Sequence, residues 1–281
     1  MVDIFKINPS KPTIMKSIRI RIEEKICYLG LNRPEKSNSL NKEMIVDLIT
    51  FLTTTSNDNN FKLLVLYGEG GGFCSGGCLE WMKQGAMQAN DENMADAKLF
   101  VDLFAAMRHY PKPIIASIEK YAFGGALGLV ACSDIAIAEE HTVFGFKEVR
   151  VGLVPATIAP HVMNKIGIGY SKKFMLTGAD FDADEAIHAG LIQYIAPSGR
   201  LKEKTKEMCR QIMLSSAHAI SQTKELLNTL EDKQLTIDAQ NKIVATYIAN
   251  SRNSQDGIEG VNSFFEKRKP IWDESPYNKK K

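Results

Sequence analysis

The sequence predicts an α/β fold, because segments with strand character alternate with segments of helical apolar spacing. The alternation runs through about the first 200 residues and stops near Leu201, after which helical spacing predominates. The chain has 281 residues, of which 44% are hydrophobic and 24% charged. This is enough for one large domain with a smaller appendage.

Each element is predicted from its composition and spacing. Strand candidates are rich in β-branched and aromatic residues, and they cover residues 26–31, 62–68, 113–122, 134–139 and 143–146. Helix candidates carry apolar residues three or four positions apart, as Met44, Ile45 and Leu48 do, and they cover residues 42–55, 96–108, 157–166 and 184–190. From residue 201 to 269 the spacing is mostly helical.

These elements divide the chain into four parts. Residues 1–16 are expected to form a mobile N-terminal extension, and residues 273–281 a mobile tail. Residues 17–200 form the α/β core, and residues 201–272 a helical C-terminal region. No internal repeat or low-complexity linker interrupts this order.

Composition limits the classes of partner. The chain has 35 basic and 33 acidic residues, so neither nucleic acid nor an anionic membrane is expected as a partner. The five cysteines contain no C-x-x-C pair, which predicts reduced thiols, with neither a disulfide framework nor a metal site. Without a signal-like N-terminus or an apolar run of about 18 residues, a soluble cytoplasmic protein is expected.

Two glycine-rich segments follow strand candidates: "GEGGGFCSGG" at residues 68–77 and "KYAFGGALGLVACSD" at residues 120–134. The first lacks the Lys-Ser/Thr pair of a P-loop, and neither completes G-x-G-x-x-G. Ser75 is not in a nucleophile elbow, because Phe73 stands where the first glycine would be.

Both segments pass from a strand through small residues into a helix, where backbone N–H groups are unpaired. Two such groups that converge could stabilise a developing oxyanion. The alternative is that the glycines only allow tight strand-to-helix turns.

Glu148 is a candidate acid or base. If the strand "VFGFKE" keeps its alternation, Phe144, Phe146 and Glu148 share one face, and burial would raise the carboxyl pKa. The alternative is that the strand ends at Phe146 and Glu148 pairs with Lys147 or Arg150.

Several ordered motifs resemble the enoyl-CoA hydratase/isomerase, or crotonase, family. They are "LNRPEKSNSLN" from Leu31, "GGGFCSGGCLEWM" from Gly70, "PKPIIASIEKYAFGGALGLVACSDIAIAEE" from Pro111 and "FGFKEVRVGLVPATIAPHVMNKIG" from Phe144. The similarity runs from about residue 18 to 272. Within the family, the sequence is most similar to the branch described as methylglutaconyl-CoA or carboxygeranoyl-CoA hydratase-like.

The resemblance implies a spiral of ββα units with C-terminal helices that make trimers, often paired into hexamers. It also implies an acyl-CoA thioester substrate, which carries its own coenzyme A, so no separate cofactor is expected. By motif position, the backbone N–H groups of Gly77 and Gly125 would form the oxyanion hole. Many hydratases of the family use two glutamates, and their positions here are Gly128 and Glu148.

The leading hypothesis is therefore reversible hydration of a 2-enoyl-CoA, branched or carboxylated, with Glu148 as the single acid/base. Double-bond isomerisation is the main alternative, because one glutamate can move a proton between C2 and C4. Dehydration or decarboxylation of an acyl thioester, and an acyl-CoA-binding protein or scaffold without turnover, also stay open.

The resemblance assigns further residues to substrate binding. Arg33, Lys36, Phe264 and Lys267 match positions that contact the phosphates or adenine, the last two commonly across a subunit boundary. Solvated surface is the alternative for the charged residues.

The backbone around Cys74, Ser75, Gly76, Cys78 and Leu79 would hold adenine and pantetheine. Cys78 stands where the family usually has aspartate, and an inert buried thiol is more common than a nucleophile.

Two further side chains, Trp81 and Met82, could line the acyl pocket or belong to the core. His161 is expected to be structural.

Overall fold

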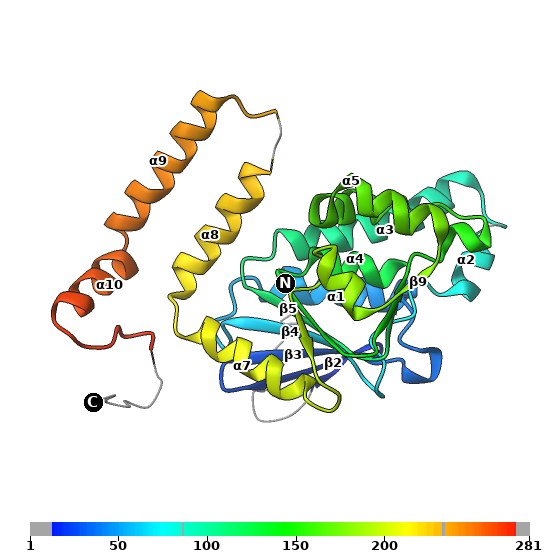
Figure 1. The fold of residues 1–281 in the computed structure, drawn as a ribbon, viewed down its shortest axis with the longest axis horizontal. Helices are drawn as coiled ribbons and strands as arrows, with labels where there is room; N and C mark the ends of the chain where they lie inside the picture. The colour runs from blue at the N-terminus through cyan, green and yellow to red at the C-terminus, as the bar shows by residue number, and fades with distance from the viewer. Residues whose placement is uncertain (1–12, 86, 232–233, 274–281) are drawn as a thin grey trace.

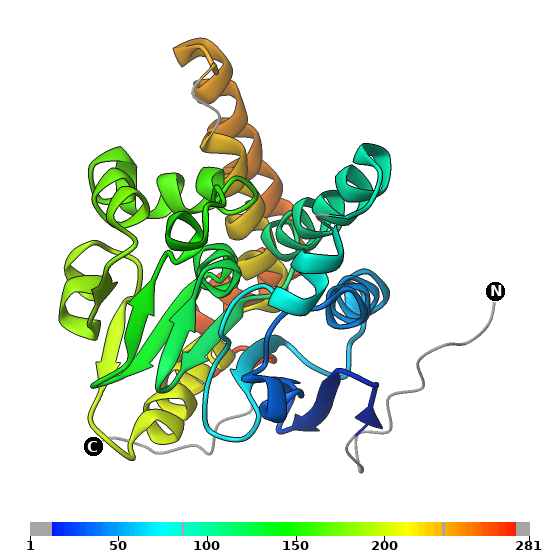
Figure 2. The same ribbon diagram turned by 90° about the vertical axis from the view of Figure 1, so that its right-hand side faces the viewer.

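A seven-stranded mixed sheet forms the body of the protein (Figures 1 and 2). The structure, a computed structural model, describes residues 13–85, 87–231 and 234–273. The sheet has the order β1-β2-β3-β4-β5-β7-β10. Its strands are β1 (Thr13–Ile14), β2 (Ile18–Glu23), β3 (Ile26–Leu31), β4 (Leu63–Gly68), β5 (Ile114–Ile118), β7 (Ile135–Glu139) and β10 (Tyr194–Ala196). From β3 to β10 all neighbours are parallel, whereas β1 to β3 are antiparallel.

A second, three-stranded sheet holds β6 (Tyr121–Phe123), β8 (Val143–Gly145) and β9 (Asp180–Phe181) in the order β6-β8-β9. The helices of the core are α1 (Lys42–Thr55), α2 (Leu79–Gly85), α3 (Asn90–Arg108), α4 (Gly125–Cys132), α5 (Ala159–Thr177) and α6 (Ala183–His188). Two short 3-10 helices, η1 (Pro34–Lys36) and η2 (Glu148–Val151), complete the core. The α/β fold predicted from the sequence is confirmed.

The C-terminal region is helical, as predicted, with α7 (Leu201–Met213), α8 (Ala217–Leu230), α9 (Ile237–Asn253) and α10 (Gln255–Phe265). Helix α7 packs on one face of the large sheet, where Met208 and Cys209 join the buried strand residues Val65 and Ile137. Helices α8, α9 and α10 extend away from the body, on the opposite side from α2 (Figure 1). We refer to residues 237–265 as the C-terminal arm.

The arm leaves large apolar side chains in solvent. Helix α9 has no buried residue among those described. The exposed apolar residues of the arm are Ile237, Val244, Ile248, Ile258, Val261, Phe264 and Phe265. Such a continuous set of exposed apolar residues marks an interaction surface more often than a solvated one.

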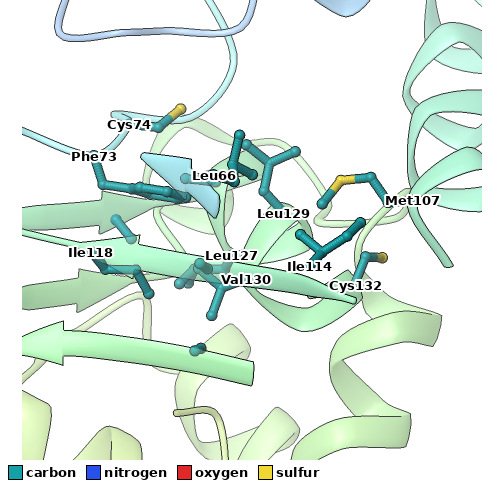
Figure 3. Packing of buried hydrophobic residues seen from close by; sticks show 14 of the residues in the cluster. Leu66, Phe73, Cys74, Met107, Ile114, Ile118, Leu127, Leu129, Val130 and Cys132 are labelled. Carbon is teal, nitrogen blue, oxygen red and sulfur yellow. The ribbon is translucent and has the colours of Figure 1, made fainter. Parts of the chain in front are cut away.

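Helix α4 forms the centre of the core. Leu127, Leu129 and Val130 are fully buried among residues of β4, β5 and α3 (Figure 3). Burial of such a side chain contributes roughly 1.5–3 kcal/mol. At the C-terminal end of the helix, Lys165 Nζ donates to Val130 O at 3.0 Å and to Ser133 O at 2.7 Å. A cation at this end also interacts favourably with the helix dipole.

Some predicted boundaries were wrong. The single strand expected over residues 113–122 is two strands in different sheets, because the backbone turns at Lys120, whose φ is 61°. Strand β8 ends at Gly145, so Glu148 does not continue its alternation and instead begins η2. Strands β1, β2, β9 and β10 were not predicted.

The two ends of the chain lie largely outside the described residues. Of the N-terminal segment 1–16, Thr13 and Ile14 pair with Ile20 and Arg19 as strand β1, contrary to the expectation of a wholly mobile extension. Residues 1–12, and residues 274–281 of the expected tail, lie outside the described part.

Candidate active site

The two glycine-rich segments run side by side where Cys74 and Ala122 form a parallel bridge, and backbone hydrogen bonds join them there. We call this meeting point of the two segments the glycine crossing. Phe123 N donates to Cys74 O at 3.1 Å, and Gly124 N donates to Gly145 O at 2.9 Å. On the other side, Leu40 N donates to Gly76 O at 2.7 Å. The segment before α2, the turn before α4 and the end of β8 are thus held together, although they are far apart in the sequence.

Glycine is required at two positions of this crossing. Gly76 has a φ of +94°, and a Cβ there would lie 2.6 Å from Phe123 O. Gly124 has a φ of +50°, and a Cβ there would lie 2.9 Å from Glu148 Oε1. A side chain at either position would strain the backbone and also collide with its neighbour.

The crossing brings the amides of Gly77 and Gly125 close together. A Cβ added to Gly125 would lie 3.5 Å from Gly77 N, and one added to Gly76 would lie 3.3 Å from Gly125 N. Within the described residues, neither of the two amides donates a backbone or side-chain hydrogen bond. Gly125 is the first residue of α4, so its N–H is one of the unpaired donors at a helix start. Two free donors of this kind can stabilise an oxyanion.

The Glu148 carboxyl lies beside this crossing, in contact with the position of Gly124. Its Oε2 is buried and has no hydrogen-bond partner among the described residues. Burial raises the pKa of Glu148 above its ordinary value. A half-buried carboxyl with a raised pKa and an oxygen that lacks a partner can exchange protons with a ligand.

Of the alternative expected for Glu148, the strand does end before it, but the pairing with Lys147 or Arg150 does not occur. Lys147 pairs with Asp180, and Arg150 Nε donates to Thr177 O at 3.1 Å. The carboxyl is buried, but the reason differs from the predicted one. The strand has already ended at Gly145, so strand alternation does not set the direction of the Glu148 side chain. The backbone at the start of η2 sets it.

A cavity of about 270 Å³ opens onto these groups. Gly77, Gly125 and Glu148 line it, and the remainder of its wall comes from α2, α3 and residues 153–158. Trp81 and Met82, which the resemblance assigned to the acyl pocket or the core, both line this cavity. The Met82 Cε atom packs against Gly77. A Cβ added to Gly77 would lie only 2.2 Å from Met82 Cε.

The position expected to carry a second glutamate is filled by apolar groups. A Cβ added to Gly128 would lie 2.4 Å from Phe104 Cζ and 2.6 Å from Ile158 Cγ2. Phe104 is fully buried and Ile158 nearly so. The site therefore has neither a carboxylate at residue 128 nor space for one.

Sequence reasoning missed Asp96, a second carboxylate that lines the cavity and is only 8% exposed. Asp96, Phe100 and Phe104 follow one another at intervals of four on α3, so they share a helix face directed at the site. That spacing is visible in the sequence and could have identified all three residues.

The residues assigned to coenzyme A fall into two groups. Arg33 and Lys36 lie near the first glycine segment, where Arg33 Nη1 donates to Ser39 O at 2.6 Å and Lys36 pairs with Glu80 at 2.8 Å. Phe264 and Lys267 lie in and just after α10, away from the cavity of their own chain (Figure 1). The structure does not bring these two groups together within one chain.

The backbone segment predicted to hold adenine and pantetheine is an irregular stretch leading into α2. Its residues differ in exposure: Cys74, Gly76 and Cys78 are buried, Ser75 is half-buried and Leu79 is 67% exposed. Leu79 starts α2, and Ser75 N donates to Ser37 O at 3.0 Å.

All five cysteines lie in the described part of the chain and are free and buried. Burial raises the pKa of the Cys74 and Cys132 thiols to about 12, which makes their thiolates scarce. In the described residues no cluster of three or more His, Cys, Asp or Glu side chains could hold a metal ion.

His161 lies away from the glycine crossing. Its ring packs against Phe104 at 5.7 Å, and burial lowers its pKa. It lines a larger hollow of about 560 Å³ between α8 and the core, which includes neither glycine amide nor Glu148.

Across the described residues, helices of a length and hydropathy suited to crossing a membrane are absent.

The sequence profile described as "Enoyl-CoA hydratase/isomerase" matches residues 21–275, which is most of the chain. The chain belongs to the enoyl-CoA hydratase/isomerase family. The two glycine segments, Glu148 and the cavity all lie within the matched range.

Two relatives support the family assignment. The chain is 30% identical over 245 residues to a protein of Thermus thermophilus named "Putative enoyl-CoA hydratase", covering 87% of this chain and 96% of the relative. It is also 30% identical over 257 residues to the "Crotonyl-CoA hydratase" of Syntrophomonas wolfei, covering 90% and 96%.

Among solved structures, an enoyl-CoA hydratase from Shewanella pealeana has a TM-score of 0.86 and 33% identity, covering 91% of this chain and 96% of that one. The fold of this hydratase/isomerase family member is thus similar to an experimental structure over nearly its whole length.

Proposed function

We propose that the protein catalyses reversible hydration of a 2-enoyl-CoA thioester, with Glu148 as the single acid/base. The observation that carries this proposal is the buried Oε2 atom of Glu148, which has no hydrogen-bond partner among the described residues, beside two free backbone amides. The names of the two relatives, both hydratases, support hydration as the activity.

In this mechanism the thioester carbonyl oxygen accepts hydrogen bonds from Gly77 N and Gly125 N. The Glu148 carboxylate takes a proton from a water molecule, whose oxygen bonds to C3 of the substrate. Electrons of the C2–C3 double bond move into an enolate, which the two amides stabilise. Protonated Glu148 then gives its proton to C2, so that H and OH have been added and the carboxylate is restored.

The size of each contribution can be bounded. One oxyanion donor contributes on the order of 10²–10³ in rate. A positioned general acid/base contributes about 10²–10⁴. Coenzyme A itself would enter with the substrate and not as a resident cofactor.

Double-bond isomerisation is a second candidate, favoured by the filled space at Gly128. With no carboxylate at residue 128 to hold water, Glu148 could take a proton from C2 of a 3-enoyl-CoA and return it to C4 of the resulting dienolate. The product is the 2-enoyl-CoA. The same residues serve both reactions, and only the presence of a reacting water differs.

The experiment that tests these proposals uses crotonyl-CoA, 3-methylglutaconyl-CoA and a 3-enoyl-CoA as substrates, with products identified by mass. A mass gain of one water that Glu148→Gln abolishes supports hydration, and a product of unchanged mass moves the assignment to isomerisation. Glu203→Gln, an exposed glutamate of α7, is the matched control and should leave turnover unchanged. Silence with all three substrates contradicts both reactions and favours an acyl-CoA-binding protein, or a dehydratase or decarboxylase.

We also propose that the protein assembles into trimers, or hexamers made from them, through the C-terminal arm. The exposed apolar residues of the arm support this proposal. Phe264 is 78% exposed and belongs to α10, which lies on the opposite side of the molecule from α2 (Figure 1), so we propose that it and Lys267 contact the coenzyme A of another copy.

Finer assignments rest on the sequence resemblance. A branched acyl group is proposed on that ground. The thioesters that name the methylglutaconyl-CoA or carboxygeranoyl-CoA branch also carry a carboxylate, so membership of that branch is tested together with the charge preference below. The free buried thiols are compatible with the proposed cytoplasmic location. Whether the acyl group is also carboxylated depends on the charges that line the cavity.

A further inference from the structure

The cavity beside Glu148 contains a second negative charge. Asp96, on α3, lines it and is 8% exposed, which is unusual for a carboxylate. Among the described residues that line the cavity, the ionisable side chains are these two acids, and none is Lys, Arg or His. A bound acyl chain would therefore experience negative charge without a facing cation.

The Asp96 carboxylate is fixed in place by two hydrogen bonds. Its Oδ1 accepts from Lys42 Nζ at 2.9 Å, and its Oδ2 accepts from Trp81 Nε1 at 2.8 Å. The Lys42 side chain is 62% exposed, whereas that of Asp96 is 10% exposed. Solvent therefore screens the cation much more than the carboxylate, and Lys42 does not line the cavity.

The same bonds make this wall of the cavity rigid. The indole of Trp81 is held at its edge by Asp96 and on its face by Phe100, with ring centroids 5.6 Å apart and planes inclined by 18°. Asp96, inside α3, thus links that helix to the first residue of α1, Lys42, and to the first turn of α2, at Trp81. A carboxylate held in this way cannot turn away from an incoming anion.

We infer that Asp96 determines specificity, so that the cavity accepts an uncharged acyl chain and discriminates against one with a terminal carboxylate. This inference rests on the proposed function, in that the cavity holds the acyl part of a CoA thioester. Like charges placed close together in a partly dry site are costly, and specificity commonly uses such repulsion against the wrong ligand. The expectation of a carboxylated substrate is not retained.

The test compares binding of pentanoyl-CoA and glutaryl-CoA, which have the same acyl length and differ in the terminal carboxylate. Binding is measured by calorimetry and needs no turnover. The full chain should prefer pentanoyl-CoA by about tenfold or more. Comparable affinity, or a preference for glutaryl-CoA, would overturn the inference.

Three variants separate charge from wall structure. Asp96→Asn removes the charge and should reduce the preference to within about threefold of unity. Lys42→Gln removes the cation that partly neutralises Asp96 and should widen the preference. Trp81→Phe removes one of the two hydrogen bonds that fix Asp96 but keeps the charge, so it should weaken binding of both thioesters and lower the preference less than Asp96→Asn does.

The remaining outcomes are also decisive. An unchanged ratio in Asp96→Asn, with thermal melting showing that the variant is folded, contradicts the inference even if the wild type prefers pentanoyl-CoA. Binding of pentanoyl-CoA without turnover of any enoyl-CoA contradicts the proposed catalysis and leaves the specificity inference standing. Failure to bind either thioester overturns both.

Discussion

The ring of Phe104 occupies the space that a side chain at Gly128 would need. A Cβ at Gly128 would lie 2.4 Å from Phe104 Cζ, inside van der Waals contact. The position that carries a glutamate in many hydratases of the resembled family is here part of the apolar core. In the proposed mechanism, proton transfer therefore depends on Glu148 alone.

Adding a side chain at Gly128 should destabilise the protein. Overpacking of a well-packed core typically costs 1–3 kcal/mol, so Gly128→Ala should lower the free energy of unfolding by about that amount. Gly128→Glu should cost more, because it also buries a carboxyl group. Denaturant titration measures both changes.

The control for this prediction is Phe104→Ala combined with Gly128→Ala. Because the smaller side chain at 104 vacates the contested space, the double variant should lose less stability than the sum of the single variants. Simple additivity would show that Phe104 is not the group that excludes a side chain at 128.

Glu148→Gln should stabilise the folded protein at neutral pH. Burial raises the folded-state pKa of Glu148 above its unfolded value of about 4.5, so the folded state binds the proton more tightly. The wild type therefore loses stability as pH rises from the unfolded pKa through the folded pKa, and the loss is complete above the folded pKa. The uncharged amide has no such loss.

The measurement is the difference in the free energy of unfolding between Glu148→Gln and wild type at several pH values. It should be small near pH 4 and should increase towards pH 7. A difference that is constant with pH would show that the carboxyl does not titrate differently in the folded state. The titration of Glu148 should also appear in the activity, because hydration needs the carboxylate form. A plot of kcat/KM against pH should rise with pH, and the midpoint of the rise should lie above pH 4.5.

Gly124→Ala should impair catalysis more than stability. An alanine would be strained at a φ of +50°, which costs about 1–3 kcal/mol, and its methyl group would displace the Glu148 carboxyl. We expect kcat to fall by on the order of 10²-fold or more, in line with loss of a positioned acid/base. Gly199→Ala is a matched control, because Gly199 has a φ of +74° with no heavy atom within 4 Å.

The two alanine variants should have comparable stability losses, and Gly199→Ala should keep wild-type kcat. Equal kcat values for the two would mean that the carboxyl position does not depend on Gly124.

Charges in the C-terminal arm should dissociate the proposed oligomer. Phe265 is 77% exposed and Ile258 is 51% exposed, so replacing both by aspartate would place two charges in an apolar interface. Light scattering should report a trimer or hexamer for the wild type and a monomer for the variant. Asn262→Asp, on the same helix at an exposed polar position, should leave the mass unchanged. A monomeric wild type at micromolar concentration would contradict the proposal.

Much of the architecture was predictable, because the buried strands around Val65 and Ile137 and the amphipathic α1 follow simple composition and spacing rules. The split of the strand at Lys120 was not, since a positive φ at a lysine has no clear local signal. Glu148 was singled out by strand alternation, yet its direction comes from η2. The filling of the Gly128 site was not predictable, because it depends on residues 24 and 30 positions away in the chain.

The burial of α4 also bears on how the protein would lose activity. Its first residue, Gly125, has the free amide that we propose as an oxyanion donor, whereas its body is packed in the core and its last carbonyls accept hydrogen bonds from Lys165. The backbone amides of Leu129 and Val130 should therefore exchange hydrogen with solvent only when the whole domain opens. A partly unfolded, long-lived state that has lost only its oxyanion hole is not expected, so inactivation and global unfolding should share one midpoint in denaturant.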